Sequence, residues 1–324
     1  MAAHLTTVAS DVPPSVELAH ALEEHARHAR GAYAANTERA LRADIVAFSA
    51  WCSGAGLAHL PAAPDTVVAF VDAMADAKAT ATIRRYVSSI ATLHRAARLP
   101  SPTETQQVKL ALKRLHRAKG RAQAQAAPLN RGLVERMLTL PTPKLRDLRN
   151  RALLAVAYDT LARRSELVEL LREDLETGPD GGGTIAVRRS KTDQEGAGAV
   201  CYLAADTVRV LRAWTDAAGI TEGPLFRSVG KTGRIGGALD RGDVARVFKA
   251  MVRAAGVPVE EAARISGHSS RVGAAQDMVR HGVDLPAVMQ AGRWRSPEMV
   301  GRYTRRLDAR RGGAAKLAER QGRA

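Results

Sequence analysis

The sequence predicts a mainly α-helical protein of two domains, and three observations support this prediction. Apolar residues recur at helical spacing along most of the chain. The length of 324 residues is sufficient for two domains, each with its own core. A segment of Ala and Gln without pattern or charge ends at Pro128 and is typical of a linker. We therefore expect a flexible tail over residues 1–13, an all-helical domain over 14–121, a linker over 122–128 and a second domain over 129–324.

The first domain should contain about five helices and no strand. One begins at Ser15, and the next is expected to start at the N-cap pair Asn36-Thr37. Thr103, with Gln106 three residues later, has the pattern of a capping box. The inward-facing stripes of the helices are formed by Leu18 and Leu22, then Leu41, Ile45 and Phe48, then Val67, Phe70 and Val71, then Ile83, Val87 and Ile90, and finally Val108, Leu112 and Leu115.

The second domain should be mixed but mostly helical, with a small antiparallel sheet. Strands are expected at Thr184–Val187 and Ala199–Leu203, as a hairpin-like pair with Lys191 at its connection. Ser296-Pro297 is a helix start, so Tyr303 should lie toward the end of a short helix. The other helices are expected at Leu129–Leu140, Asp147–Thr160, after the break at Leu161–Arg164, and at Asp206–Ala217, Asp240–Ala254, His268–His281 and Leu285–Ala291.

The charge balance indicates a polyanionic partner. Lys and Arg number 49 against 33 Asp and Glu, a net charge of +16. Both parts of the chain are positively charged. Residues 1–127 contain 15 basic and 10 acidic residues, and the remainder contains 34 basic and 23 acidic residues. No apolar run approaches the roughly 20 residues that span a bilayer, and the N-terminus lacks the pattern of a signal peptide. Nucleic acid, rather than a membrane, is therefore the expected partner.

Cysteine usage fits a reducing compartment. Cys52 and Cys201 are far apart in the sequence and are expected to be reduced core residues rather than a disulfide. No Cys/His cluster has zinc spacing, so we expect neither a metal nor a cofactor, and we expect no small-molecule substrate. The predicted location is the cytoplasm, with the protein on the nucleoid when it is bound to DNA.

Basic residues gather on the outer faces of the predicted helices. Residues 109–121 contain six Lys and Arg and no acid. For any one residue, a solvated helix face explains the charge as well as a phosphate contact does; together they favour a track for the DNA backbone. The candidates for DNA contact are Arg39, Arg84, Arg85, Lys113 and Arg121 in the first domain, and Arg241 and Arg246 in the second.

The residues with the most specific chemistry lie in the last quarter of the chain. His268 and Arg271 are three apart and share a helix face; Trp294 and Tyr303 follow. A phenol has a pKa of about 10 and needs help to act as a nucleophile. An arginine offers a planar fork for phosphate oxygens, and histidine carries protons near neutral pH. This combination suits covalent attack on a phosphodiester.

Seven residues, taken in chain order, resemble the site of the tyrosine recombinase (phage integrase) family. They are Arg163-x-x-Glu166, Lys191, His268-x-x-Arg271, Trp294 and Tyr303. The resemblance runs from about Asn36 to Leu317, and is closest to a phage recombinase branch with Trp at the position where most members have His. It implies a clamp of two domains around DNA. It also implies a dimer on each pair of inverted-repeat half-sites and a tetramer in synapsis, with the segment Gly312–Arg320 docking into a neighbouring protomer.

The same resemblance implies a role for each residue. Tyr303 would become linked to the 3′ phosphate, while Arg163 and Arg271 hold that phosphate. Lys191 would protonate the departing oxygen, Glu166 would support His268, and no metal or ATP would be needed. Arg163 is chosen over Arg164 because of the Arg-x-x-Glu spacing. Arg188 or Arg189 would take the place of Lys191 if the hairpin register differed.

Two other functions remain open from the sequence. One is a DNA-binding regulator that no longer cuts, which the complete set of residues argues against. The other is a type IB topoisomerase, which shares the chemistry but does not join two sites. The helical N-terminal domain argues against it.

Overall fold

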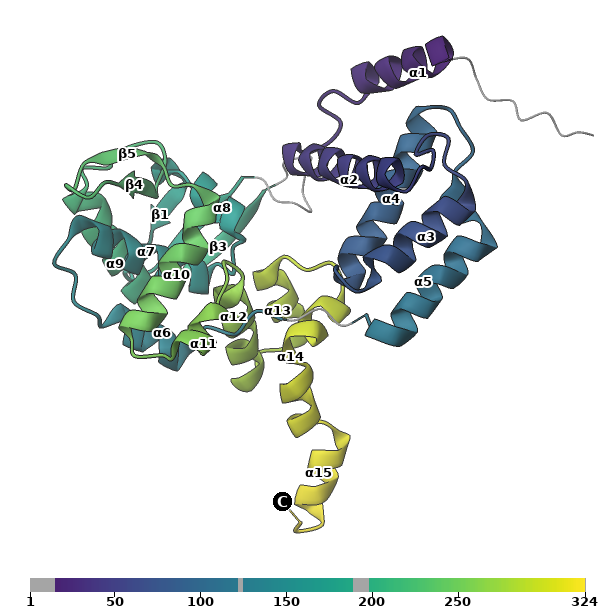
Figure 1. Ribbon diagram of the computed structural model, residues 1–324. Coiled ribbons are helices and arrows are strands. Elements are labelled where there is room, and N and C mark those ends of the chain that lie inside the picture. Colours follow the sequence, from purple (N-terminus) through teal and green to yellow (C-terminus); the bar gives the residue numbers. More distant parts are fainter. Residues whose placement is uncertain (1–14, 122–124, 189–197, 324) are drawn as a thin grey trace, which may run out of the picture. The chain divides into compact units, whose positions relative to one another are not determined.

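A computed structural model describes residues 15–121, 125–188 and 198–323. The chain divides into two compact units, Met1–Ala124 and Gln125–Ala324 (Figure 1). The predicted tail over 1–13, part of the predicted linker, and Lys191 fall outside the described residues. Within the described ranges, no helix is both long and apolar enough to cross a membrane.

The first unit is helical throughout its described residues (Figure 1). Its core forms where the aromatic rings of Phe48 and Phe70 meet edge to face, with centroids 5.0 Å apart, and where Ile83 and Val108 are fully buried. The helices are α1 (Ser15–His28), α2 (Ala35–Gly54), α3 (Pro64–Ala75), α4 (Thr80–Ala96) and α5 (Gln106–Lys119), with a 3₁₀ turn, η1, over Pro102–Glu104. The predicted stripes of α3 and α4 are buried, as are Phe48 of α2 and Val108 and Leu115 of α5. The other predicted inward residues, Leu18, Leu22, Leu41, Ile45 and Leu112, are only partly buried.

Two predicted helix starts in this unit are wrong. Helix α2 begins at Ala35, before Asn36-Thr37, and has no side-chain cap. Thr103 lies inside η1, where its hydroxyl pairs with Ser101 at 3.0 Å. Helix α5 begins after Thr105, whose hydroxyl donates backward to the carbonyl of Pro102. The 3₁₀ turn uses the side chains that would otherwise have capped the helix.

A buried carboxylate joins α2 to α4. Asp44 is 1% exposed and accepts hydrogen bonds from Nε and Nη2 of Arg85 at 2.9 and 2.8 Å. The hydroxyl of Ser89 donates to the same carboxylate at 2.9 Å. Arg85, whose side chain is 53% exposed, is among the residues predicted to contact DNA and also binds Asp44. It therefore has a structural role that its neighbour Arg84, exposed on the same helix, does not share.

We predict that Arg85→Ala lowers the free energy of unfolding by about 2 kcal/mol, because it leaves a buried carboxylate with one donor. Urea unfolding of the full chain checks this. Arg84→Ala is the matched control and should change the free energy by less than about 0.5 kcal/mol. Equal effects of the two substitutions would contradict a structural role for the Arg85–Asp44 pair.

The second unit combines helices with two small antiparallel sheets. Strands β1 (Leu175–Thr177), β2 (Gly183–Val187) and β3 (Ala199–Leu203) form one sheet in that order. In it, Thr184 pairs with Tyr202, as the predicted hairpin requires. Strand β1 was not predicted, nor was the sheet of β4 (Arg227–Val229) and β5 (Ile235–Ala238). All of these strands are short, and β5 is rich in glycine, so their sequences carry little alternation.

The helices of this unit are α6 (Arg131–Leu138), α7 (Leu145–Asp159), α8 (Arg164–Glu169), α9 (Ala205–Ala217), α10 (Arg241–Ala254), α11 (Val259–Ala263), α12 (Ser269–Arg280), α13 (Leu285–Gly292), α14 (Pro297–Arg311) and α15 (Gly313–Arg320), with a 3₁₀ turn, η2, over Arg172–Asp174. Helix α7 is buried along most of its length and packs against α6, α8, α9, α10 and α12. Ser296 caps α14 as predicted, accepting from the amide of Glu298. The mainly helical fold class is thus confirmed.

The chain enters the second unit along helix α12. The amide of Leu129 donates to the carbonyl of Ser269 at 2.9 Å, and the amide of Arg131 donates to Asp277 at 2.6 Å. The hydroxyl of Tyr158 on α7 reaches the same Asp277 oxygen at 2.7 Å. A Cβ atom on Gly273 would lie 1.8 Å from the carbonyl oxygen of Leu129. Only a glycine at position 273 allows the backbone of Leu129 to pass this close to α12.

We predict that Gly273→Ala destabilises the protein by more than about 3 kcal/mol, because backbone rather than a flexible side chain must move. Thermal unfolding checks this prediction. Gly301→Ala is the control, since a Cβ there meets nothing within 4 Å; it should be neutral or stabilise α14 by up to about 1 kcal/mol. A neutral Gly273→Ala would show that the close approach is not required.

Candidate active site

Arg163 and Glu166 meet at the start of α8. The chain turns sharply at Leu161, whose φ of 50° is left-handed, and Arg163 becomes the N-cap of the helix. Glu166 accepts from the backbone amide of Arg163 at 2.9 Å and from its Nη1 at 2.6 Å. The Arg-x-x-Glu spacing is therefore a local capping arrangement that places one guanidinium group beside one buried carboxylate.

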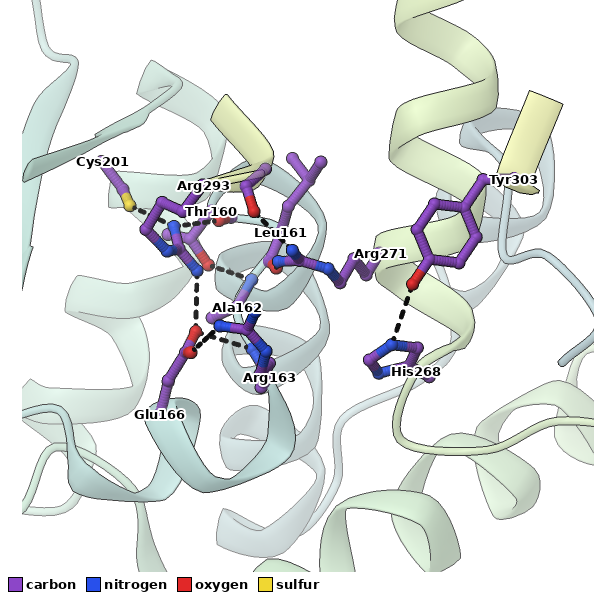
Figure 2. A network of polar contacts seen from close by, with 11 residues as sticks. Thr160, Leu161, Ala162, Arg163, Glu166, Cys201, His268, Arg271, Arg293 and Tyr303 are labelled. Atoms are coloured by element: carbon purple, nitrogen blue, oxygen red, sulfur yellow. Dashed lines mark hydrogen bonds and ion pairs between the residues drawn. The ribbon is translucent and has the colours of Figure 1, made fainter. Parts of the chain in front are cut away.

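Glu166 also binds a residue that the sequence did not identify. Its Oε2 accepts from Nη2 of Arg293 at 2.7 Å (Figure 2). The predicted support of His268 by Glu166 stays a prediction, and the charge of Glu166 acts to raise the pKa of His268. A carboxylate that is 3% exposed requires close cations, and two guanidinium groups provide them. Burial raises the pKa of Glu166, but the hydrogen bonds from Arg163 and the charge of Arg293 outweigh it and lower the pKa overall. Glu166 is therefore ionised.

Arg271 is 1% exposed on α12 and is held by backbone. Its Nη1 donates to the carbonyl of Leu161 and its Nη2 to that of Gly292. Its guanidinium carbon lies 4.5 Å from the centroid of the Trp294 ring, in a cation–π contact. Burial, together with the charges of Arg163 and Arg293, lowers the pKa of Arg271 to about 10. Arg271 thus stays protonated at neutral pH.

His268 and Tyr303 form the other half of the cluster. The imidazole Nε2 lies 3.2 Å from the Tyr303 hydroxyl, and in Figure 2 the hydroxyl points toward the ring. Gln276 donates to the backbone carbonyl of Tyr303 at 2.9 Å, which ties α14 to α12. Tyr303 is 7% exposed and lies within α14, where the sequence predicted a helix.

The electrostatic environment keeps His268 neutral. Burial is the main cause that lowers its pKa below the ordinary value of 6.5, and the charges of Arg271 and Arg163 lower it further. A neutral imidazole can accept a proton from the phenol that it touches. The cluster can therefore deprotonate Tyr303 next to a positive field.

Trp294 closes one side of the cluster. Its ring centroid lies 5.5 Å from that of Tyr303, and a Cβ atom on Gly292 would lie 2.2 Å from the indole. The indole Nε1 is buried and has no hydrogen-bond partner among the described residues. A buried N–H without an acceptor is costly.

The structure brings together six of the seven predicted site residues: Arg163, Glu166, His268, Arg271, Trp294 and Tyr303. Lys191 lies outside the described residues, between β2 and β3. The sequence did not identify Arg293, although it stands beside Trp294 in Ala291-Gly-Arg-Trp294. Nothing in the sequence distinguishes an inward-facing arginine from an exposed one at that position.

The DNA-contact candidates lie on helix surfaces. Arg39, Arg84, Arg85, Lys113, Arg121 and Arg246 are exposed, and Arg241 is partly exposed. Some have partners: Arg39 donates to Asn36, Arg121 to His116, and Arg246 pairs with Asp243. Across the described ranges, no group of three or more His, Cys, Asp or Glu residues is arranged to hold a metal ion.

Comparisons with known proteins agree with this cluster. The model of the phage integrase family matches residues 129–310. The integrase/recombinase xerD homolog of Selenomonas ruminantium is 35% identical over 207 residues, which is 60% of this chain and 60% of that protein. The recombinase cre of Escherichia phage P1 is 30% identical over 307 residues, 90% of each chain.

The fold also matches a solved structure, the XerH site-specific recombinase bound to a palindromic difH substrate. The TM-score is 0.60, with 19% identity, over 79% of this chain and 72% of that one. Fold, cluster and family model agree on the class of the protein. The chain belongs to the phage integrase family, that of the tyrosine recombinases, and the resemblance found in the sequence is confirmed.

We predict that in the DNA-free protein His268 titrates below pH 6.5 and that Arg163→Ala raises its pKa, because one nearby positive charge is removed. Imidazole nitrogen chemical shifts followed by NMR across pH 4.5–8 check both. Arg98→Ala, in the first unit, is the control and should leave the His268 titration unchanged. A His268 pKa above 6.5 would contradict the assignment of a neutral imidazole.

Proposed function

We propose that the chain is a site-specific DNA recombinase that cleaves and rejoins duplex DNA through a 3′-phosphotyrosine intermediate. The observation that carries the proposal is the Tyr303 hydroxyl, 3.2 Å from the His268 imidazole in a cluster with the buried, charged Arg271. A phenol beside a neutral base and a guanidinium group is equipped to attack phosphorus.

In the first step, the Tyr303 oxygen attacks the scissile phosphorus while His268 accepts the phenolic proton. The bond from phosphorus to the 5′ oxygen breaks, and that oxygen leaves as a hydroxyl after it receives a proton. By the family resemblance, Lys191 donates that proton, a role suited to an amine whose pKa shifts readily. The products are a tyrosine-linked 3′ phosphate and a free 5′ hydroxyl.

The arginines stabilise the charge that develops in the transition state. Arg163 and Arg271 would hold the non-bridging oxygens, and Trp294 Nε1, which lacks an acceptor, would donate to one of them. Arg163 and Arg293 pair with the single buried carboxylate of Glu166, while Arg271 donates only to backbone carbonyls. The three guanidinium groups therefore carry more positive charge than the one carboxylate balances. Removing one preorganised donor of this kind typically lowers the rate by about 10²- to 10³-fold.

Rejoining reverses the chemistry with a different strand. The phosphotyrosine conserves the energy of the broken phosphodiester, so the 5′ hydroxyl of a second strand can attack it and release Tyr303. No step of this sequence consumes ATP or requires a metal ion. Exchange between two DNA sites follows from two such reactions.

The proposed partner is duplex DNA with inverted-repeat half-sites, bound by a dimer on each site and a tetramer in synapsis. The DNA-bound XerH neighbour, whose substrate is palindromic, and the +16 charge support this. Arg39, Arg84, Arg85, Lys113, Arg121, Arg241 and Arg246 are the proposed DNA contacts. Helix α15, on which Leu317 is half exposed, is proposed to dock into a neighbouring protomer.

We predict that on a nicked duplex carrying its own site, the wild-type protein forms a denaturant-stable DNA adduct and Tyr303→Phe forms none, because the nucleophilic oxygen is absent. DNA affinity in a gel-shift assay should stay within about twofold, since the phenol adds little ground-state binding. Tyr202→Phe, which changes an exposed tyrosine on β3, is the control and should form the adduct normally.

The site itself can be selected from a random duplex pool by its binding to the full-length protein. On that site, binding without an adduct would favour a regulator that no longer cuts. Relaxation of supercoiled DNA without joining of two sites would favour a type IB topoisomerase. Tyr303-dependent joining of two sites would establish the recombinase.

A further inference from the structure

Arg293 occupies a backbone conformation that normally favours glycine. It ends α13 with φ 51° and ψ 48°, in the left-handed region. A residue with a Cβ atom is strained there, whereas glycine is not. Since the sequence places an arginine at this position, its side chain must form interactions that compensate for the strain.

The side chain does form such interactions, and they lie at the catalytic cluster. Nη1 of Arg293 donates to the carbonyl of Thr160 at 3.0 Å and to the Sγ of Cys201 at 2.9 Å. Nη2 donates to Glu166 at 2.7 Å. One guanidinium group thereby joins the end of α7, helix α8 and strand β3 to the junction of α13 and α14 (Figure 2).

Arg293 is linked to Arg163 by the carboxylate of Glu166, which accepts hydrogen bonds from both arginines. The Oε1 of Glu166 accepts from Nη1 of Arg163, and its Oε2 accepts from Arg293. If the side chain of Arg293 were absent, a carboxylate that is only 3% exposed would be held by Arg163 alone, through its backbone amide and its Nη1. Its orientation, and with it that of the Arg163 guanidinium, would then be less restricted.

Arg293 also lies between two groups that contact Arg271. The carbonyl of the preceding residue, Gly292, accepts from Arg271, and the ring of the following residue, Trp294, stacks on it. The left-handed turn at Arg293 sets the direction in which both groups face. The side chain of Arg293 therefore orients Arg163, and its backbone orients Arg271. These are the two arginines that are proposed to hold the phosphate.

We propose that Arg293 is a positioning residue that fixes Arg163, through Glu166, and Arg271, through the Gly292–Trp294 backbone, in the geometry required by the scissile phosphate. This inference rests on the proposed function. We assign Arg293 a positioning role rather than that of a phosphate ligand, because both of its Nη atoms donate to protein atoms.

Arg293→Gly tests the proposal, since glycine suits the backbone conformation and removes only the side chain. We expect single-turnover cleavage of the nicked duplex to fall about 100-fold, the cost of a misplacement of about 1 Å at the reacting centre. DNA affinity should remain within about twofold, because the loss appears in the transition state. Arg98→Gly is the matched control: Arg98 has φ 58° but lies at the surface of the first unit, and the variant should cleave as the wild type does.

Rescue separates positioning from general support of the fold. Guanidinium ion at low, non-denaturing concentration should restore cleavage in Arg293→Gly at least about 10-fold, because it can occupy the site of the missing group between Glu166 and Cys201. It should not accelerate the wild type or Arg98→Gly. Arg293→Lys, which keeps the charge without the planar fork, should remain slow.

The proposal is overturned if Arg293→Gly cleaves at the wild-type rate. It is also overturned if the slow variant is not rescued by guanidinium, or if its loss of rate is matched by a loss of DNA affinity. Failure of the proposed function is recognised separately, because the wild-type protein would then form no Tyr303-dependent adduct in the same assay.

Discussion

The arrangement of the catalytic cluster depends on an excess of buried positive charge. Arg163, Arg271 and Arg293 lie around one carboxylate, that of Glu166, and Arg271 is almost entirely removed from solvent. Buried like charges repel strongly, so the protein must supply other acceptors. It supplies backbone carbonyls, those of Thr160, Leu161 and Gly292. The positive charge that remains favours an anion, and in the proposed mechanism this anion would be the scissile phosphate, whose negative charge grows in the transition state.

Those carbonyls are available because the backbone takes two uncommon turns. Leu161 and Arg293 have φ values of 50° and 51°, and each turn lies where a helix ends or begins. The turn at Leu161 directs one carbonyl at Arg271 and brings Arg163 to the N-cap of α8. The turn at Arg293 directs the Gly292 carbonyl at the same guanidinium group. Strain of this kind persists where the surroundings compensate for it, and here the compensation is provided by the hydrogen bonds of the arginines.

Sequence reasoning succeeded where a residue type and a spacing determine the geometry. Helical periodicity predicted the buried faces of α2 to α5, and the three-residue spacing of His268 and Arg271 placed both at the start of α12. It failed where the outcome depends on contacts between distant segments. Helix α2 begins one residue before the predicted cap at Asn36, and Thr103 lies in a 3₁₀ turn instead of capping α5. Strands as short as β1 and β4 leave no alternation to detect. Glu166 and Arg293 are 127 residues apart, so their pairing has no local signature in the sequence.

In the proposed mechanism, the charges that would hold the phosphate also act on the base. Arg271 and Arg163 lower the pKa of His268, so the imidazole is neutral in the DNA-free protein. A bound phosphate would cancel part of that positive potential, and the proton affinity of the imidazole would then rise. The rise would come as His268 accepts the phenolic proton of Tyr303, whose oxygen lies 3.2 Å away. Substrate binding and base strength would thus be coupled through Arg163 and Arg271. Arg271 and His268 lie at the start of one helix, α12, which hydrogen bonds join to Leu129 and Arg131, so two of the groups to be coupled belong to a single element.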